Sequence, residues 1–105
     1  MLVRDIQRWI GEPLPVVRVM PNTPAMVAAG ASGMYASPQV NAAQVDFAES
    51  LMRAVGLVVW VQQESLMDAV TALSGSGPAY VFLVMEAMED AAVALGLDRR
   101  TARLL

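Results

Sequence analysis

The secondary-structure signals along this chain change once, near Gln62–Glu64. Before this point, short β-branched or apolar runs bounded by glycine and proline alternate with amphipathic segments, as in α/β proteins. After it, every periodic segment has helical spacing. The sequence therefore predicts an α/β part at residues 1–62 followed by an all-α part at residues 63–105, so that the chain holds parts of two domains.

Residues 1–62 carry signals for two helices and three strands. Helices are predicted at residues 2–10 and 41–54, and strands at residues 16–20, 26–36 and 57–61. Asn41 is the expected N-cap of the second helix, and Gly56 is expected to close it. The third strand is continuously apolar, which favours a strand that is covered on both faces.

Residues 63–105 carry only helical signals. Ser65 and Asp68 have the spacing of a capping box before the first apolar segment. A predicted loop at residues 74–78, with the sequence Ser-Gly-Ser-Gly-Pro, separates that segment from a long helix at residues 79–95. The long helix is apolar almost all round over its first half, so it has to be buried on most sides. A last helix is predicted at residues 99–105, with Asp98 as its expected N-cap.

The composition indicates apolar surface that one small domain would not need. Hydrophobic residues make up 56% of the 105 residues even without the seven glycines, whereas this class with glycine included makes up about 45–50% of an average soluble domain. The longest apolar runs, residues 54–61 and 78–85, are far shorter than the roughly 20 residues of a membrane-spanning helix. No segment resembles a secretion signal. We therefore expect a cytoplasmic chain, the middle of a longer protein, that buries its apolar surface against further sequence and a second subunit.

Three residue types are absent, and their absence removes whole classes of chemistry. The sequence has no cysteine, histidine or lysine. Disulfides, the usual zinc sites, serine–histidine catalysis, Schiff bases and the phosphate-loop lysine are therefore excluded, and no metal site is expected. The net charge of −3 and the lack of a basic cluster interleaved with aromatic residues argue against nucleic-acid binding.

One candidate binding segment follows the first predicted strand. Asn22 offers a carboxamide and Thr23 a hydroxyl, and the flanking Pro21 and Pro24 hold both in a rigid, non-repetitive turn after Met20. In open α/β sheets, ligands bind beyond the carboxyl ends of strands. The alternative is a plain structural turn.

A second candidate lies at the start of the long helix. Glycines in the Ser-Gly-Ser-Gly-Pro segment permit close backbone approach, and a helix N-terminus can hold an anion. Close packing of another helix explains the same glycines, and the segment matches neither GxxxxGK[ST] nor GxGxxG. Glu64 is either a charge that stabilises the following helix or an acceptor for a cationic or N–H-bearing ligand.

Taken together, these segments are more specific than each alone. The stretch from Arg18 to Pro24 (Arg-Val-Met-Pro-Asn-Thr-Pro) and the stretch from Asp68 to Tyr80 (Asp-Ala-Val-Thr-Ala-Leu-Ser-Gly-Ser-Gly-Pro-Ala-Tyr) resemble pyrroline-5-carboxylate reductase. The resemblance continues through residues 86–88 and 94–97 and spans nearly the whole chain.

The resemblance implies a specific reaction and assembly. In this family a Rossmann domain binds NADPH or NADH, a helical domain interlocks two subunits, and hydride reduces 1-pyrroline-5-carboxylate to L-proline. It implies a homodimer or higher homo-oligomer through residues 79–95. The implied cofactor-side residues are Met20, Pro21, Asn22, Thr23 and Pro24, and the implied substrate-side residues are Glu64, Ser74, Gly75, Ser76 and Gly77.

Two motifs of the family are missing from these 105 residues. One is the glycine-rich dinucleotide fingerprint, and the other is the Ser-Pro-Gly-Gly-x-Thr motif that holds the substrate carboxylate. No residue of the chain is therefore assigned as catalytic, and a polypeptide of these residues alone is expected to be inactive. Two alternatives stay open, a non-catalytic helical dimerisation module or remnant of the family, and a reductase of another cyclic imine.

Overall fold

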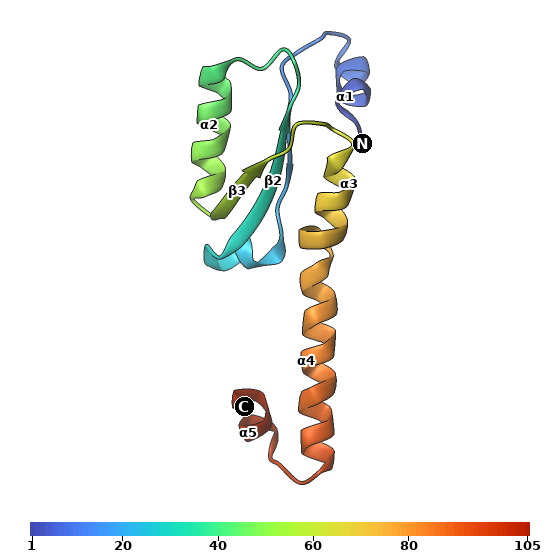
Figure 1. The fold of residues 1–105 in the computed structure, drawn as a ribbon, viewed down its shortest axis with the longest axis vertical. Helices are drawn as coiled ribbons and strands as arrows, with labels where there is room; N and C mark the ends of the chain where they lie inside the picture. Colours follow the sequence, from blue (N-terminus) through green and yellow to red (C-terminus); the bar gives the residue numbers. More distant parts are fainter.

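The computed structural model describes all 105 residues as a small sheet region from which a long helix extends (Figure 1). The elements are α1 (Val3–Ile10), β1 (Val17–Met20), the 3₁₀ helix η1 (Thr23–Val27), β2 (Gly30–Ala36), α2 (Ala42–Arg53), β3 (Gly56–Trp60), α3 (Leu66–Val70), the π-helical turn η2 (Thr71–Gly75), α4 (Gly77–Ala94) and α5 (Arg99–Leu104). All strands precede residue 61 and only helices follow, so the predicted order of an α/β part and an all-α part is confirmed.

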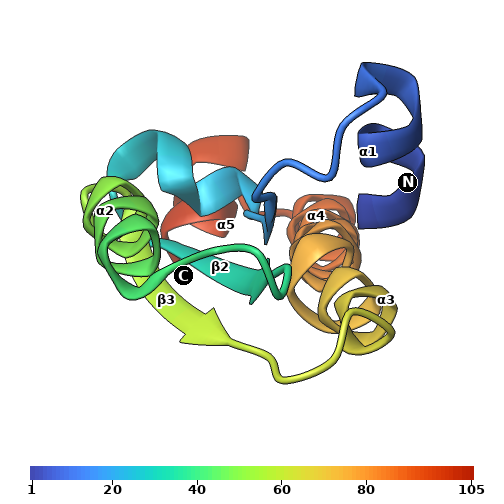
Figure 2. The same cartoon turned by 90° about the horizontal axis from the view of Figure 1, so that it is seen from above.

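The sheet is mixed and lies between helices. The strand order is β1-β2-β3, with β1 antiparallel to β2 and β2 parallel to β3. In the view from above, α2 covers one face and the α3–α4 column lies on the other (Figure 2). Because side chains alternate along a strand, the two faces have separate contacts. The central strand is therefore the most enclosed part of the chain.

The core is centred on β2. Met34 is completely buried, and Val58, Met67 and Ser32 are also buried. On one face, the Trp60 indole Nε1 donates a 2.7 Å hydrogen bond to Glu49 of α2. On the other face, α3 packs so closely on β2 that Gly33 has room only for its hydrogen atoms beside Val70.

The prediction that the third strand is covered on both faces is wrong for this chain. Leu57 is 59% exposed and Val59 is 54% exposed, whereas Val58 between them is buried. Leu57 and Val59 point to the face on which α3 lies, but α3 covers β2 and leaves β3 uncovered there. The continuous apolar run therefore has one free face.

The helix-end predictions had mixed outcomes. Asn41 caps α2 as predicted, accepting a hydrogen bond from Gln44 N, and Asp98 likewise caps α5. Gly56 does not close α2, which ends at Arg53; it begins β3 instead. The capping box at Ser65 is also wrong, because Ser65 has helical backbone angles and its side chain makes no capping hydrogen bond.

The second predicted strand starts later than expected. Residues 23–27 form η1, so β2 begins at Gly30 rather than at residue 26. Pro24 lies in the first turn of η1, where its missing N–H costs no helical hydrogen bond. The segment after Met20 is thus partly helical instead of a wholly non-repetitive turn.

The chain is far more extended than a domain of its size. Its radius of gyration is 18.8 Å, whereas a compact chain of about 100 residues has about 13 Å. The cause is α4, which projects away from the sheet with α5 folded back beside its far end (Figure 1). Along α4, Val81, Phe82 and Leu83 are each more than half exposed. None of the helices has both the length and the hydropathy needed to cross a membrane.

The contact between α2 and β3 gives a prediction for acid conditions. Hydrogen bonds from Trp60 and Arg53 hold the pKa of Glu49 below its ordinary value of 4.5. A lowered folded-state pKa stabilises the fold above the ordinary value, and this contribution is lost as pH falls through the folded-state pKa. NMR titration of Glu49 is expected to show a midpoint below 4.5. Trp60→Phe, which removes the indole donor, should raise it; an unchanged midpoint contradicts the contact.

Candidate functional site

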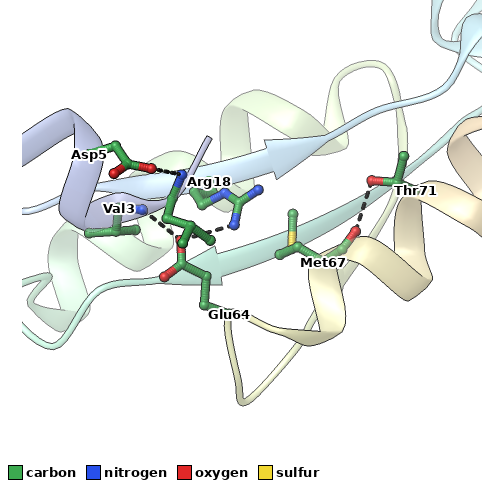
Figure 3. A network of polar contacts seen from close by, with 7 residues as sticks. Val3, Asp5, Arg18, Glu64, Met67 and Thr71 are labelled. Carbon is green, nitrogen blue, oxygen red and sulfur yellow. Dashed lines mark hydrogen bonds and ion pairs between the residues drawn. The ribbon is translucent and has the colours of Figure 1, made fainter.

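Glu64 joins three elements of the fold just after the last strand. Its Oε1 accepts a 2.6 Å hydrogen bond from the backbone N–H of Val3 and a 2.9 Å charge-assisted bond from Arg18 Nη1 (Figure 3). The Arg18 and Glu64 side chains are only 19% and 23% exposed. The carboxylate thereby links the start of α1 and the strand β1 to the segment just before α3. Its Oε2 makes no hydrogen bond within the chain.

A second contact joins β1 to the helical segment. The Met20 side chain lies against Gly75, where an added Cβ would overlap Met20 Cε. The two candidate segments of the sequence, Met20–Pro24 and Ser74–Gly77, therefore meet in the structure. The glycine at position 75 allows close packing here, but against strand β1 rather than against another helix as expected from the sequence.

The segment of residues 74–78 is not the loop that the sequence predicts. The chain stays helical through η2, where Ser76 N donates to Thr71 O over five residues at 2.8 Å. Pro78 has no N–H to continue the α-helical ladder, and the Ser74 hydroxyl bonds back to Val70 O. Both features favour a local change of helix type over an open loop, and single π turns of this kind are frequent at functional sites.

Asn22 and Thr23 lie at the end of β1 with free donors. Asn22 Oδ1 accepts a 2.9 Å hydrogen bond from Ala31 N, which fixes the side chain and leaves its amide hydrogens available. Thr23 is exposed, and its hydroxyl makes no hydrogen bond within the chain. Because β1 runs antiparallel to β2, this end of β1 lies at the amino ends of the parallel pair β2 and β3 rather than at their carboxyl ends.

Glu64 lies apart from the other candidate residues. Ten residues, nine of them helical, separate it from Gly75, which corresponds to about 15 Å along a helix axis. The structure therefore brings Met20 to Gly75 and brings Glu64 to Arg18. It does not bring Glu64 to Ser74–Gly77.

Sequence reasoning missed Arg18 as a site residue. The available signal was a single charged residue within an otherwise apolar, β-branched strand, which requires a partner when the strand is covered. A hollow of about 200 Å³ also lies between β2, β3 and η2, lined by Gly33, Val59 and Leu73 among others. It is mainly apolar, and no group of three acidic side chains lies close enough to hold a metal ion.

Comparison with known proteins shows which family this chain resembles. A family model described as pyrroline-5-carboxylate reductase dimerisation matches residues 64–105. A pyrroline-5-carboxylate reductase of Pseudomonas aeruginosa is 57% identical over 101 residues, which are 96% of this chain and 37% of that protein. Over almost its whole length, the chain is thus similar to part of a pyrroline-5-carboxylate reductase. The resemblance predicted from the sequence is confirmed.

Solved structures agree with the sequence comparison. A pyrroline-5-carboxylate reductase from Coxiella burnetii matches with a TM-score of 0.85 and 54% identity over 94% of this chain and 37% of that chain. A Plasmodium falciparum pyrroline carboxylate reductase with NADP bound matches with a TM-score of 0.91 and 32% identity, over 98% and 41% of the two chains. The chain thus spans about two fifths or less of the length of these relatives.

Proposed function

We propose that the protein carrying this segment reduces 1-pyrroline-5-carboxylate to L-proline with NADPH or NADH. The observation that carries the proposal is the agreement in sequence and fold with reductases of this name over almost the whole chain. Residues 1–62 are proposed to be part of the cofactor domain, and residues 63–105 part of the dimerisation domain. The predicted cytoplasmic location stays a prediction.

The donors at the end of β1 fit the carboxamide end of a nicotinamide. Asn22 has free amide hydrogens and is held by Ala31, and Thr23 has a free hydroxyl. Neutral, oriented donors and acceptors are what a carboxamide requires. When bound, the nicotinamide supplies the hydride. We therefore propose Met20, Pro21, Asn22, Thr23 and Pro24 as the cofactor side of the site.

The substrate side is proposed to lie at the π turn. Ser74, Gly75, Ser76 and Gly77 are half-buried and Gly75 lies against Met20, so substrate held there would lie next to the cofactor side. Glu64 stays a predicted substrate contact, for which its unbonded Oε2 provides an acceptor. Ten residues nevertheless separate Glu64 from Gly75, along the helical segment of α3 and η2.

The test of this function uses the protein expressed from its complete reading frame. NADPH or NADH oxidation that depends on 1-pyrroline-5-carboxylate is expected. Thr23→Val is expected to raise the KM for the cofactor up to about tenfold, since a neutral hydrogen bond contributes about 0.5–1.5 kcal/mol. Thr101→Val on α5 is the matched control. If the KM for the imine rises instead, Thr23 is on the substrate side; absence of imine-dependent turnover contradicts the proposed function.

We also propose a homodimer or higher homo-oligomer formed through α4. The match of residues 64–105 to a dimerisation family and the exposed apolar surface of α4 support it. Burying such surface stabilises association by roughly 25 cal/mol per Å² before the entropic cost is subtracted. A non-catalytic dimerisation module would share this property and lack the turnover.

Light scattering of the same protein is expected to give the mass of a dimer or a larger assembly. Phe82→Glu places a charge on the exposed apolar surface of α4 and should shift the mass towards the monomer. Phe47→Glu on α2, where the aromatic side chain is similarly exposed, is the matched control. A monodisperse monomer before mutation, or an unchanged mass in Phe82→Glu, contradicts the proposed interface.

A further inference from the structure

The side chains of Arg18 and Met20 lie on the same face of β1. Residues two apart on a strand point to the same side of the sheet. Here that side faces the helical segment of residues 66–75, because Arg18 binds Glu64 and Met20 contacts Gly75. A single strand thus contacts both ends of this segment.

The two contacts bracket the helical segment, and a third lies between them. Glu64 precedes α3 by two residues, and Gly75 is the last residue of η2. Between them, Val70 packs against Gly33 of β2 with no space to spare. Sliding of the segment along the sheet would have to break all three contacts together.

The contact at Glu64 is the polar one of the three. Ser65 provides no side-chain cap, so the start of α3 is held through Glu64, which accepts hydrogen bonds from the Arg18 guanidinium and from Val3 N–H. Charge-assisted hydrogen bonds are roughly twice as strong as neutral ones. Removing one partner of a half-buried pair also leaves the other charge without its partner. Loss of either side chain should therefore loosen the start of α3.

We propose that Arg18 and Glu64 form a positioning pair, which sets where Ser74–Gly77 stand relative to Asn22 and Thr23. The inference rests on the proposed reductase function, because these two groups are the proposed substrate and cofactor sides. Hydride transfer requires reacting atoms at about 3–3.5 Å, and a misplacement of about 1 Å can cost about 100-fold in rate. The pair acts through the helical segment and touches no reacting atom.

The test compares kinetic constants in the protein expressed from its complete reading frame. Arg18→Met and Glu64→Gln are each expected to lower kcat about 10- to 100-fold with little change in KM. The double variant should be no slower than the slower single variant, because both changes break one contact. Arg18→Lys keeps the charge and should recover part of kcat. Arg53→Met, which breaks the Arg53–Glu49 pair on the other face, is the matched control.

Hydrogen exchange gives a second measurement that needs no turnover. In Arg18→Met and Glu64→Gln, the amides of residues 71–76 should exchange faster than in the unmodified protein, whereas Arg53→Met should leave them unchanged. If the unmodified protein does not reduce the imine, the proposed function fails while exchange still tests the positioning pair. The pair is overturned if Arg18→Met changes neither kcat nor exchange. It is equally overturned if Glu64→Gln raises only the substrate KM, which assigns Glu64 a direct substrate contact.

Discussion

Gly33→Ala is expected to destabilise the protein by about 1–3 kcal/mol, the usual cost of overpacking a close contact. An alanine Cβ at this position would overlap Val70 Cγ1 and lie 3.0 Å from Val70 Cγ2. Valine is branched at Cβ and cannot turn both methyl groups away. The helical segment would therefore have to move off β2. Chemical denaturation of the protein expressed from its complete reading frame measures the loss.

A second variant separates a steric effect from a backbone effect. Val70→Ala removes both methyl groups, so the double variant Gly33→Ala/Val70→Ala should regain part of the lost stability. Gly77→Ala is the matched control, because an added Cβ there meets nothing within 4 Å. Full stability of Gly33→Ala would mean that α3 does not pack on β2 as described. A double variant that is no better than Gly33→Ala alone would place the cause in the backbone.

A polypeptide of these 105 residues alone is expected to show no turnover of 1-pyrroline-5-carboxylate above background NADPH oxidation. It contains neither a glycine-rich dinucleotide fingerprint nor a Ser-Pro-Gly-Gly-x-Thr motif. Hydride transfer depends on holding donor and acceptor together. The relatives that are named pyrroline-5-carboxylate or pyrroline carboxylate reductases are more than twice as long as this polypeptide. Nine of the 105 residues are buried, so the apolar surface of the polypeptide lacks its partners.

The assay compares this polypeptide with the protein expressed from the complete reading frame at equal concentration. Turnover by the longer protein alone would agree with the expectation. Turnover by the 105-residue polypeptide would show that the residues at Met20–Pro24 and Ser74–Gly77 suffice for binding and transfer, and would contradict it. Circular dichroism of the polypeptide serves as the control, because a helical but inactive polypeptide rules out unfolding as the cause.

The sequence by itself determined the order of elements, two of the predicted caps and the family. Local rules decide these features: apolar spacing distinguishes strands from helices, and Asn41 and Asp98 provide side-chain oxygens to nearby backbone N–H groups. The family followed from the motifs at Arg18–Pro24 and Asp68–Tyr80, because their residue types and separation are specific. None of these inferences requires knowing which residues meet in space.

Tertiary structure alone decided the contacts around the candidate site. The antiparallel direction of β1 put Asn22 at the opposite edge from the carboxyl ends of β2 and β3, and local sequence does not encode strand direction. The Ser-Gly-Ser-Gly-Pro segment has loop composition, yet its residues are helical and Gly75 lies against Met20. Glu64 has a sequence position that suits a ligand contact, but its partners, Val3 and Arg18, are 61 and 46 residues away. Such long-range pairings depend on how β1 and α3 pack together, which local propensity and spacing do not specify.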